Sequence, residues 1–127
     1  MDNYPEFWDE EEKEVGLVRL SRVTYHLAED QPDAMGWKVA DIEGIQLGKV
    51  SDLLADLGTG QIVFVAVTSD DTGKTALIPV EGAFLDLTNS ILMLPVRELD
   101  IRRCPDFNDD VIDVMPYIDY WMRVESL

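Results

Sequence analysis

Turn-forming residues recur at short intervals between residues 36 and 96, and they leave room only for short segments between them. These segments are apolar and rich in β-branched and aromatic residues, as in IVFVAV at residues 62–67, and none of them shows a helical period. This spacing is typical of a small sandwich or barrel. About six strands are predicted, over residues 37–40, 47–57, 62–68, 75–80, 83–87 and 91–96.

A closed barrel is the favoured arrangement, because a small all-β domain that closes on itself leaves no exposed edge strand. The pair Leu53-Leu54 breaks the alternation of residues 47–57, which indicates a bulge or a strong bend. Side chains fill the interior of a barrel this small, so we expect a sealed interior and a function that lies on the outer surface. The predicted fold class is therefore mainly β: a small barrel of about six strands with a short C-terminal helix.

The closely spaced glycines raise the question of a nucleotide site. A phosphate-binding loop needs a glycine five residues before the glycine of its GK[ST] group, and a helix after it. Here Thr68 stands at that position relative to Gly73, and the residues after Thr75 are predicted to form a strand. A phosphate would find no helix N-terminus, so no cofactor is predicted. The glycines are interpreted as turn residues that supply positive φ: Gly44, Gly48, Gly58, Gly60 and Gly73.

Residues 1–16 form an acidic leader in which aromatic side chains interrupt a run of carboxylates. Acidic runs are normally solvated, but Phe7 and Trp8 are unfavourable in water. We expect these two side chains and Tyr4 to pack either on the domain's own surface or on a neighbouring subunit. The barrel domain itself is predicted over residues 17–100.

Residues 101–127 form a C-terminal extension that is predicted to end in a short helix from Tyr117 to about Val124, with Pro116 in its first turn. Three side chains would share one face of this helix: Ile118, Trp121 and Met122. That face is expected to pack on the barrel or on a second copy of the chain. The candidates for a subunit interface are Phe7, Trp8, Tyr117, Tyr120 and Trp121.

The chain carries 26 acidic residues against 10 basic ones, for a net charge of −16. Such a surface repels phosphate backbones, so no nucleic acid is expected to bind. One cysteine and one histidine exclude an intrachain disulfide and the common zinc sites. No apolar run is long enough to span a membrane, and the acidic N-terminus does not resemble an export signal, so the protein is predicted to be cytoplasmic.

Residues that could carry catalysis are sparse. His26 is the one histidine that could serve as a base, and a pair with Cys104 would require folding to bring the two together. The carboxylate pairs at residues 70–71 and 109–110 could bind a hard cation weakly, but neither has the spacing of a calcium loop, and solvated charge is the favoured interpretation. No catalytic residue and no metal ligand is predicted.

Short motifs follow one another along the chain: GWKV at 36–39, DIEG at 41–44, GKVSDLLAD at 48–56, GQIVFVAV at 60–67 and LIPV at 77–80. In this order and spacing they resemble the PRC-barrel domain family over roughly residues 17–100. The resemblance implies a small PRC-type β-barrel, like that of the photosynthetic reaction centre H subunit and of the ribosome maturation factor. The membrane-spanning helix of the H subunit has no counterpart in this sequence.

Members of that family are generally non-catalytic, so the resemblance implies a module for protein–protein interaction or assembly. The protein is predicted to bind itself, as a homodimer or a higher homo-oligomer, and to bind a further, unidentified protein. An acidic surface favours basic or amphipathic partners. Two alternatives remain open: a ribosome- or RNA-associated maturation factor, and an ion-responsive module that uses the aspartate-rich loops.

Overall fold

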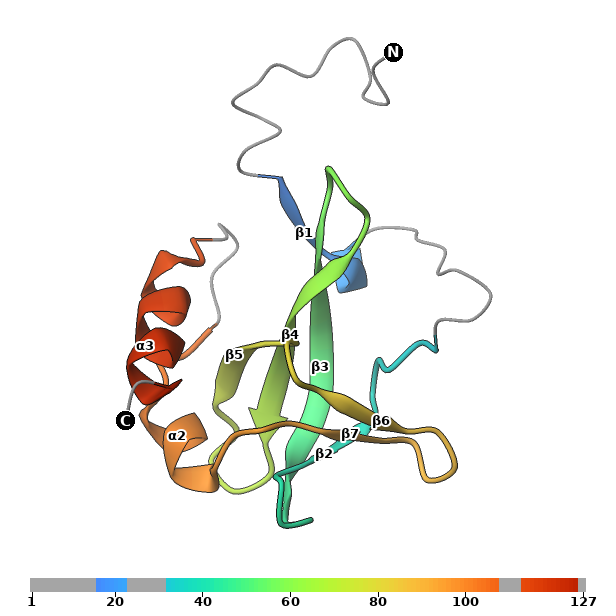
Figure 1. The fold of residues 1–127 in the computed structure, drawn as a ribbon, viewed down its shortest axis with the longest axis vertical. Helices are drawn as coiled ribbons and strands as arrows, with labels where there is room; N and C mark the ends of the chain where they lie inside the picture. The colour runs from blue at the N-terminus through green and yellow to red at the C-terminus, as the bar shows by residue number, and fades with distance from the viewer. Residues whose placement is uncertain (1–15, 23–31, 108–112, 126–127) are drawn as a thin grey trace, which may run out of the picture.

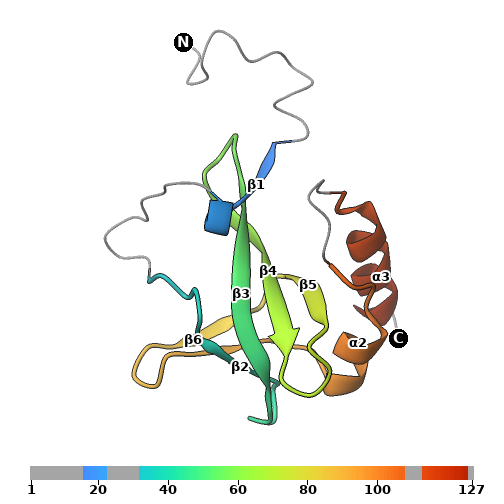
Figure 2. The same ribbon diagram turned by 180° about the vertical axis from the view of Figure 1, so that it is seen from behind.

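The computed structural model describes residues 16–22, 32–107 and 113–125 of the chain. Strands dominate this part of the chain (Figure 1 and Figure 2). They are β1 (Leu17–Arg19), β2 (Lys38–Ala40), β3 (Gln46–Asp56), β4 (Ile62–Ser69), β5 (Thr75–Pro79), β6 (Phe84–Asp86) and β7 (Ile91–Met93). The other elements are the 3-10 helix η1 (Leu20–Arg22) and the helices α2 (Glu98–Arg103) and α3 (Met115–Glu125). The prediction of a mainly β fold with a short C-terminal helix is confirmed.

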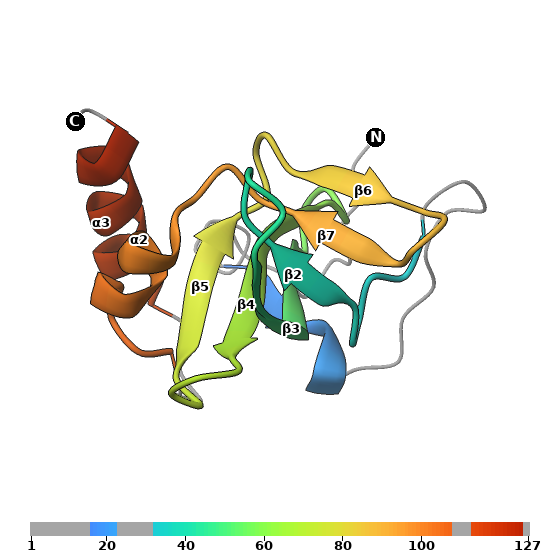
Figure 3. The same ribbon diagram turned by 90° about the horizontal axis from the view of Figure 1, so that it is seen from below.

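Strand β3 organises the sheet, because it pairs with β1, β2 and β4. β4 lies along one edge of β3, while β2 and β1 follow one another along the other edge, opposite its beginning and its end. The strand order is β5-β4-β3-β2-β7-β6, and β2–β7 is a parallel pair in an otherwise antiparallel sheet. The strands curve round a common interior, which is visible from below in Figure 3.

Hydrogen bonds do not close this sheet into a complete cylinder, because no pairing joins β5 to β6 among the described strands. The expectation of a closed barrel is corrected on this point. The outer edge of β5 is bordered by the C-terminal extension, where the Phe107 amide donates to the Thr75 carbonyl at 2.8 Å and Ala76 bridges to Asp106. Free strand edges attract foreign strands, and this contact shields one of the two ends of the sheet.

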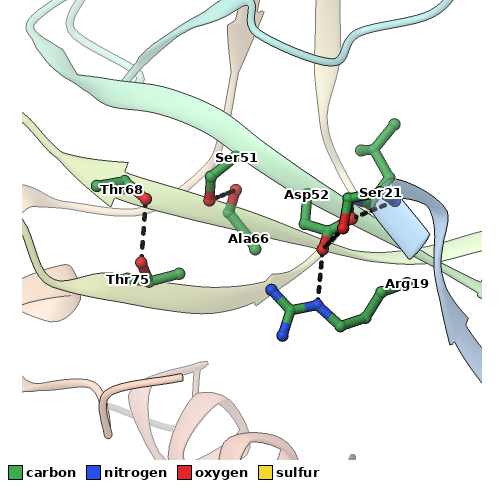
Figure 4. Close-up of polar contacts among 8 residues, drawn as sticks. Arg19, Ser21, Ser51, Asp52, Ala66, Thr68 and Thr75 are labelled. Atoms are coloured by element: carbon green, nitrogen blue, oxygen red, sulfur yellow. Dashed lines mark hydrogen bonds and ion pairs between the residues drawn. The ribbon is translucent and has the colours of Figure 1, made fainter. Parts of the chain in front are cut away.

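Two register shifts bend β3, one between Val50 and Asp52 and one after Leu54, which confirms the predicted bend. At the first shift Ser51 has no cross-strand partner, and its hydroxyl donates to the Ala66 carbonyl at 3.2 Å (Figure 4). An extra residue of this kind changes which face the following side chains point to. The residues that follow the bulge in β3 are buried on both faces of the strand.

Most of the glycines that were predicted to turn the chain lie in connections between strands. Gly44, Gly60 and Gly73 have positive φ and precede β3, β4 and β5. Gly58 lies in the β3–β4 turn as predicted, where its amide donates to a carboxylate oxygen of Asp56 at 2.8 Å, but its φ is not positive, so that part of the prediction is wrong. A strand, and not a helix, follows Gly60 and Gly73. Neither glycine therefore stands before a helix N-terminus that could bind a phosphate.

Gly48 is a correction to the predicted set of turn glycines, because it lies inside β3. A Cβ atom at this position would stand 2.1 Å from the backbone carbonyl oxygen of Thr68 on β4. The position therefore requires glycine because two strands approach each other closely, and not because a turn needs positive φ.

One apolar core fills the inside of the curved sheet. Its most deeply buried apolar side chains come from four strands and the segment after β7: Val39, Leu54, Val65, Val67, Leu77, Ile78 and Leu94. The C-terminal extension contributes further buried members: Ile101, Cys104, Phe107, Tyr117 and Trp121. The extension is thus part of the same core as the barrel.

Helix α3 confirms the predicted C-terminal helix, with Pro116 as its second residue. The predicted apolar face is partly wrong, because Met122 is 64% exposed while Tyr117 and Trp121 are buried. Helix α2 was not predicted from the sequence. Its N-cap residue is Arg97, which is not one of the side chains that usually mark a helix start.

Candidate functional site

A buried carboxylate joins the beginning of the described chain to the centre of the sheet (Figure 4). Asp52 accepts hydrogen bonds from the Arg19 guanidinium at 2.7 Å, the Ser21 hydroxyl at 2.6 Å and the Ser21 amide at 3.1 Å. The Leu53 amide donates to it as well, at 2.9 Å. The Arg19 guanidinium also lies over the ring of Phe107, 5.0 Å from its centre. This network holds β1 and η1 against β3, and its oxygen atoms are occupied by the protein itself.

The other buried carboxylates are occupied in the same way. Asp41 accepts from the amides of Glu43 and Ile45, both at 2.9 Å, and shapes the β2–β3 turn. Asp100 accepts from the side chain and the amide of Arg97. In the part of the chain that the structure describes, no buried side-chain nitrogen or oxygen atom lacks a partner. The buried polar groups therefore have structural roles there, and none of them points to a missing ligand.

The Cys104 thiol is fully buried. Burial raises its pKa to about 11, in spite of opposing contributions from the Leu77 backbone and from Lys74. A nucleophilic cysteine needs the opposite environment, with a lowered pKa and access to solvent. His26 lies outside the described residues.

We expect Cys104 to resist alkylation in the folded protein. With a pKa near 11, about one thiol in a thousand is ionised at pH 8, and the burial of the sulfur slows the reaction further. Iodoacetamide labelling followed by mass spectrometry should show little modification in native buffer and complete modification in denaturant. Rapid labelling of the native protein would contradict this assignment.

The predicted cation candidates are not assembled into a site. Asp70 accepts from the Gln46 side-chain amide at 2.8 Å, whereas Asp71 forms an ion pair with Arg102 at 3.1 Å. The pair at residues 109–110 lies outside the described residues. Within residues 16–22, 32–107 and 113–125, no three His, Cys, Asp or Glu side chains gather in a way that could hold a metal ion.

The structure separates the five interface candidates. Tyr117 and Trp121 are 6% and 4% exposed, so they are core residues, and their assignment to a subunit interface is corrected. Trp121 donates its indole N–H to the Leu77 carbonyl at 2.7 Å. Tyr120 is partly buried, packs edge-on against Trp121 at 5.0 Å and donates its hydroxyl to the backbone of Asp100. The remaining two candidates, Phe7 and Trp8, lie outside the described residues.

Replacing Trp121 with phenylalanine tests this assignment. The variant is expected to lower the free energy of unfolding by about 1–2 kcal/mol, because the Leu77 carbonyl loses its buried indole donor. Urea denaturation measures this change, and light scattering on the same samples should give the molecular mass of the unmodified protein. A changed mass with unchanged stability would place Trp121 at a subunit interface instead.

A wide depression of about 580 Å³ lies between the β2–β3 turn and α2. Its two arginines already bind carboxylates, since Arg97 pairs with Asp100 and Arg102 pairs with Glu98 and Asp71. The depression is open, and its charged side chains compensate one another. We therefore do not assign the candidate site to it.

A smaller groove of about 240 Å³ opens into the barrel interior and is lined entirely by apolar residues. They are Pro32, Ala34, Leu53, Ile62, Val65, Val80, Ala83, Leu85 and Leu92, and we call this set the groove. Two cross-strand pairs contribute to it, Leu53 with Val65 and Leu85 with Leu92. Its inner lining residues Leu53, Val65 and Leu92 are 3%, 0% and 4% exposed, so side chains fill the interior beneath the groove.

The segment that contributes Ala83 and Leu85 to the groove also carries exposed apolar side chains. Leu85 is 38% exposed, and its neighbours Phe84 and Leu87 are 64% and 65% exposed. The sequence analysis did not single out this segment, although its composition, AFLDL at residues 83–87, places apolar residues at both alternating positions of a predicted strand. Apolar residues on both faces of this strand were the available signal, but the sequence does not show which face the fold leaves uncovered.

Comparison with known proteins gives one match. The sequence model of the family described as PRC-barrel domain matches residues 31–101, while no curated protein matches the chain. β1, which pairs with β3, and helix α3 lie outside this matched region, while helix α2 begins inside it and ends just after it. None of the helices in the described ranges is long and apolar enough to cross a bilayer.

Proposed function

The chain belongs to the PRC-barrel domain family, and from this premise we propose that it is a non-catalytic module that acts by binding other proteins. PRC-barrel domains are generally non-catalytic modules. The buried polar groups of the described chain are used for structure, and its cysteine is buried and has a raised pKa. These properties support a binding role over an enzymatic one.

The observation that carries the proposal is the apolar surface around the groove. Leu85, which lines the groove, is 38% exposed, and Leu87, two residues further on, is 65% exposed, beside an opening that has no polar lining residue. Exposed apolar side chains that gather beside a concave apolar surface are typical of protein-binding sites. Isolated exposed apolar residues elsewhere, such as Met122 on α3, do not adjoin the groove residues.

The proposal is tested with the full chain as bait in an extract of its host at native salt. Each captured protein is then purified and titrated against the full chain by calorimetry. We expect at least one protein to bind saturably, and Leu87→Ser to weaken this binding about tenfold. Met122→Ser is the matched control, because Met122 and Leu87 are almost equally exposed.

Two results separate the parts of this proposal. If no captured protein binds saturably in pure form, the binding role itself is wrong. If a partner binds but Met122→Ser weakens it and Leu87→Ser does not, the role stands and the surface is a different one.

Self-association is part of the proposal, with a narrower basis than the sequence suggested. The sequence supported self-association by aromatic residues at both ends of the chain. Tyr117 and Trp121 belong to the core, so the support now comes from the aromatic residues of the leader. Light scattering of the full chain over a wide concentration range tests it. We expect a mass above that of one chain, and a monomer at all concentrations would remove this part.

A further inference from the structure

We propose that the groove binds a segment of a partner protein that inserts one apolar side chain and carries lysine or arginine residues on both sides of it. This inference rests on the proposed function and names the chemistry of the partner. It follows from the size of the groove, from the charges around it and from the charge of the chain as a whole.

The size of the groove fits a side chain better than a cofactor. An apolar cavity of about 150 Å³ can hold a benzene ring, while sites for small molecules usually measure about 300–1,000 Å³. The groove measures about 240 Å³, and no residue that lines it has a polar side chain to orient a ligand. One aromatic or branched aliphatic side chain from a longer segment matches this volume and this lining.

The groove is bordered by acidic residues and by no basic ones. Among the described residues that adjoin a groove residue in the chain, the charged ones are Asp33, Asp52, Glu81 and Asp86. Asp52 is buried and paired with Arg19. Asp86 lies opposite Ile91 in the row of Lys38, on the face turned away from Leu85 and Leu92, so Asp33 and Glu81 are the exposed carboxylates next to the groove.

Basic side chains on the strands nearby point away from the groove. Lys38 lies opposite Ile91, and the next pair along these two strands is Val39 with Leu92, a groove residue. Because neighbouring residues of a strand point to opposite faces, Lys38 lies on the face that is turned away from Leu92. An apolar groove with an acidic rim favours a partner with basic residues around its apolar anchor.

The same charges disfavour two other occupants. Residues 1–16 of this chain contain seven acidic residues and one lysine, so its own leader would bring like charge to the rim. A second copy of the chain carries a net charge of −16 and meets the same repulsion. Both occupants are therefore included as outcomes of the test.

Three fluorescent peptides serve as probes of the full-length protein, read by anisotropy at low and at physiological salt. The first has two leucines flanked by lysines, the second has glutamate in place of lysine, and the third is a synthetic copy of residues 1–14. We expect only the lysine peptide to bind, and more weakly at higher salt. In two-dimensional NMR of the unmodified protein, this peptide should shift the methyl signals of Leu53, Val65 and Leu92.

Matched variants assign the binding to the groove. Leu85→Gln should weaken the lysine peptide about tenfold, whereas Leu57→Gln, at a similarly exposed leucine in the β3–β4 turn, should change its affinity less than about twofold. Glu81→Gln should weaken binding about twofold at low salt, and Glu43→Gln, in the β2–β3 turn, should not. Circular dichroism verifies that each variant is folded, and the NMR shifts locate the site without any variant.

Several outcomes would overturn the proposal. The proposal is wrong if Leu85→Gln and Leu57→Gln lose the same affinity for the lysine peptide. It is also wrong if the glutamate peptide or the leader copy binds, or if the methyl signals that shift belong to residues outside the groove. A dimer that Leu85→Gln dissociates would identify the groove as a contact between copies. The peptide experiments do not use a natural partner. Their failure would therefore overturn the chemistry proposed for the groove, while the binding role is tested separately by the captured proteins.

Discussion

Replacing Asp52 with alanine is expected to lower the free energy of unfolding by about 3 kcal/mol. The substitution removes a carboxylate whose side chain is 1% exposed and leaves the Arg19 guanidinium, itself only 18% exposed, without its carboxylate. The donors on Ser21 and the Leu53 amide also lose their acceptor. Breaking a buried pair from one side costs more than the pair contributes, because the remaining partner stays desolvated.

Urea denaturation of the full chain measures this loss, and Asp71→Ala is the control. Asp71 also pairs with an arginine, but its side chain is 67% exposed, so we expect a change below about 1 kcal/mol. Similar losses in the two variants would show that the burial of the Asp52 pair has no special role in stability.

The same carboxylate predicts how stability depends on pH. Burial alone would raise the pKa of Asp52, but the hydrogen bonds from Ser21, Arg19 and the Leu53 amide together lower it below its ordinary value of 3.8. The folded state therefore binds this proton less readily than the unfolded state does. Its contribution to stability is complete above the unfolded pKa and is lost as the pH falls through the folded pKa.

The stability difference between the unmodified protein and Asp52→Asn should accordingly be constant near neutral pH and shrink below about pH 4. Urea denaturation at a series of pH values checks this. A difference that stays constant down to the most acid pH at which the protein folds would contradict the assignment of a lowered pKa to Asp52.

Replacing Gly48 with alanine is expected to cost about 3 kcal/mol, or to prevent folding. The new Cβ atom would meet the Thr68 carbonyl oxygen at 2.1 Å and its carbonyl carbon at 2.9 Å. Both atoms belong to the backbone of β4, so no change of a side-chain rotamer can relieve the clash. The two strands would have to separate where the central pairing of the sheet lies.

Gly60→Ala separates this clash from the ordinary cost of replacing a glycine. Gly60 has φ near +72°, and a Cβ atom there would meet nothing within 4 Å. We expect it to cost about 1 kcal/mol, from the left-handed backbone alone. Circular dichroism and urea denaturation compare the two variants. A Gly48→Ala protein as stable as Gly60→Ala would show that β3 and β4 can separate at this point without difficulty.

Six of the seven described strands were predictable because each depends on residues close together in the chain, whereas β1 was not predicted. Short β-branched runs between turn residues placed β4 and β5 nearly to the residue, and Pro116 placed the start of α3. The break in alternation at Leu53-Leu54 located the bend of β3. These features depend on backbone preferences and local side-chain periods, which a single sequence displays directly.

The motif that resembles the family includes two residues whose roles were not evident from it. Gly48 was assigned to a turn, and Asp52 was quoted without a role. In the fold, Gly48 allows β3 and β4 to approach, and Asp52 anchors β1 and η1. The motif therefore describes how the barrel is built. It also contributes Leu53 to the groove that supports the proposed function, while Leu85 and Leu92 come from outside the quoted motifs.

Sequence patterns were sufficient for the class of fold, the family resemblance and the acidic charge, because turns, strand periods and composition are properties of neighbouring residues or of simple sums. Folding was needed to decide which aromatic residues are core and where an apolar surface stays uncovered. Those outcomes depend on contacts between distant residues: Arg19 with Asp52 is 33 positions apart, and Trp121 with Leu77 is 44 apart. A side chain is buried or exposed according to what the rest of the chain places over it, and no local pattern contains that information.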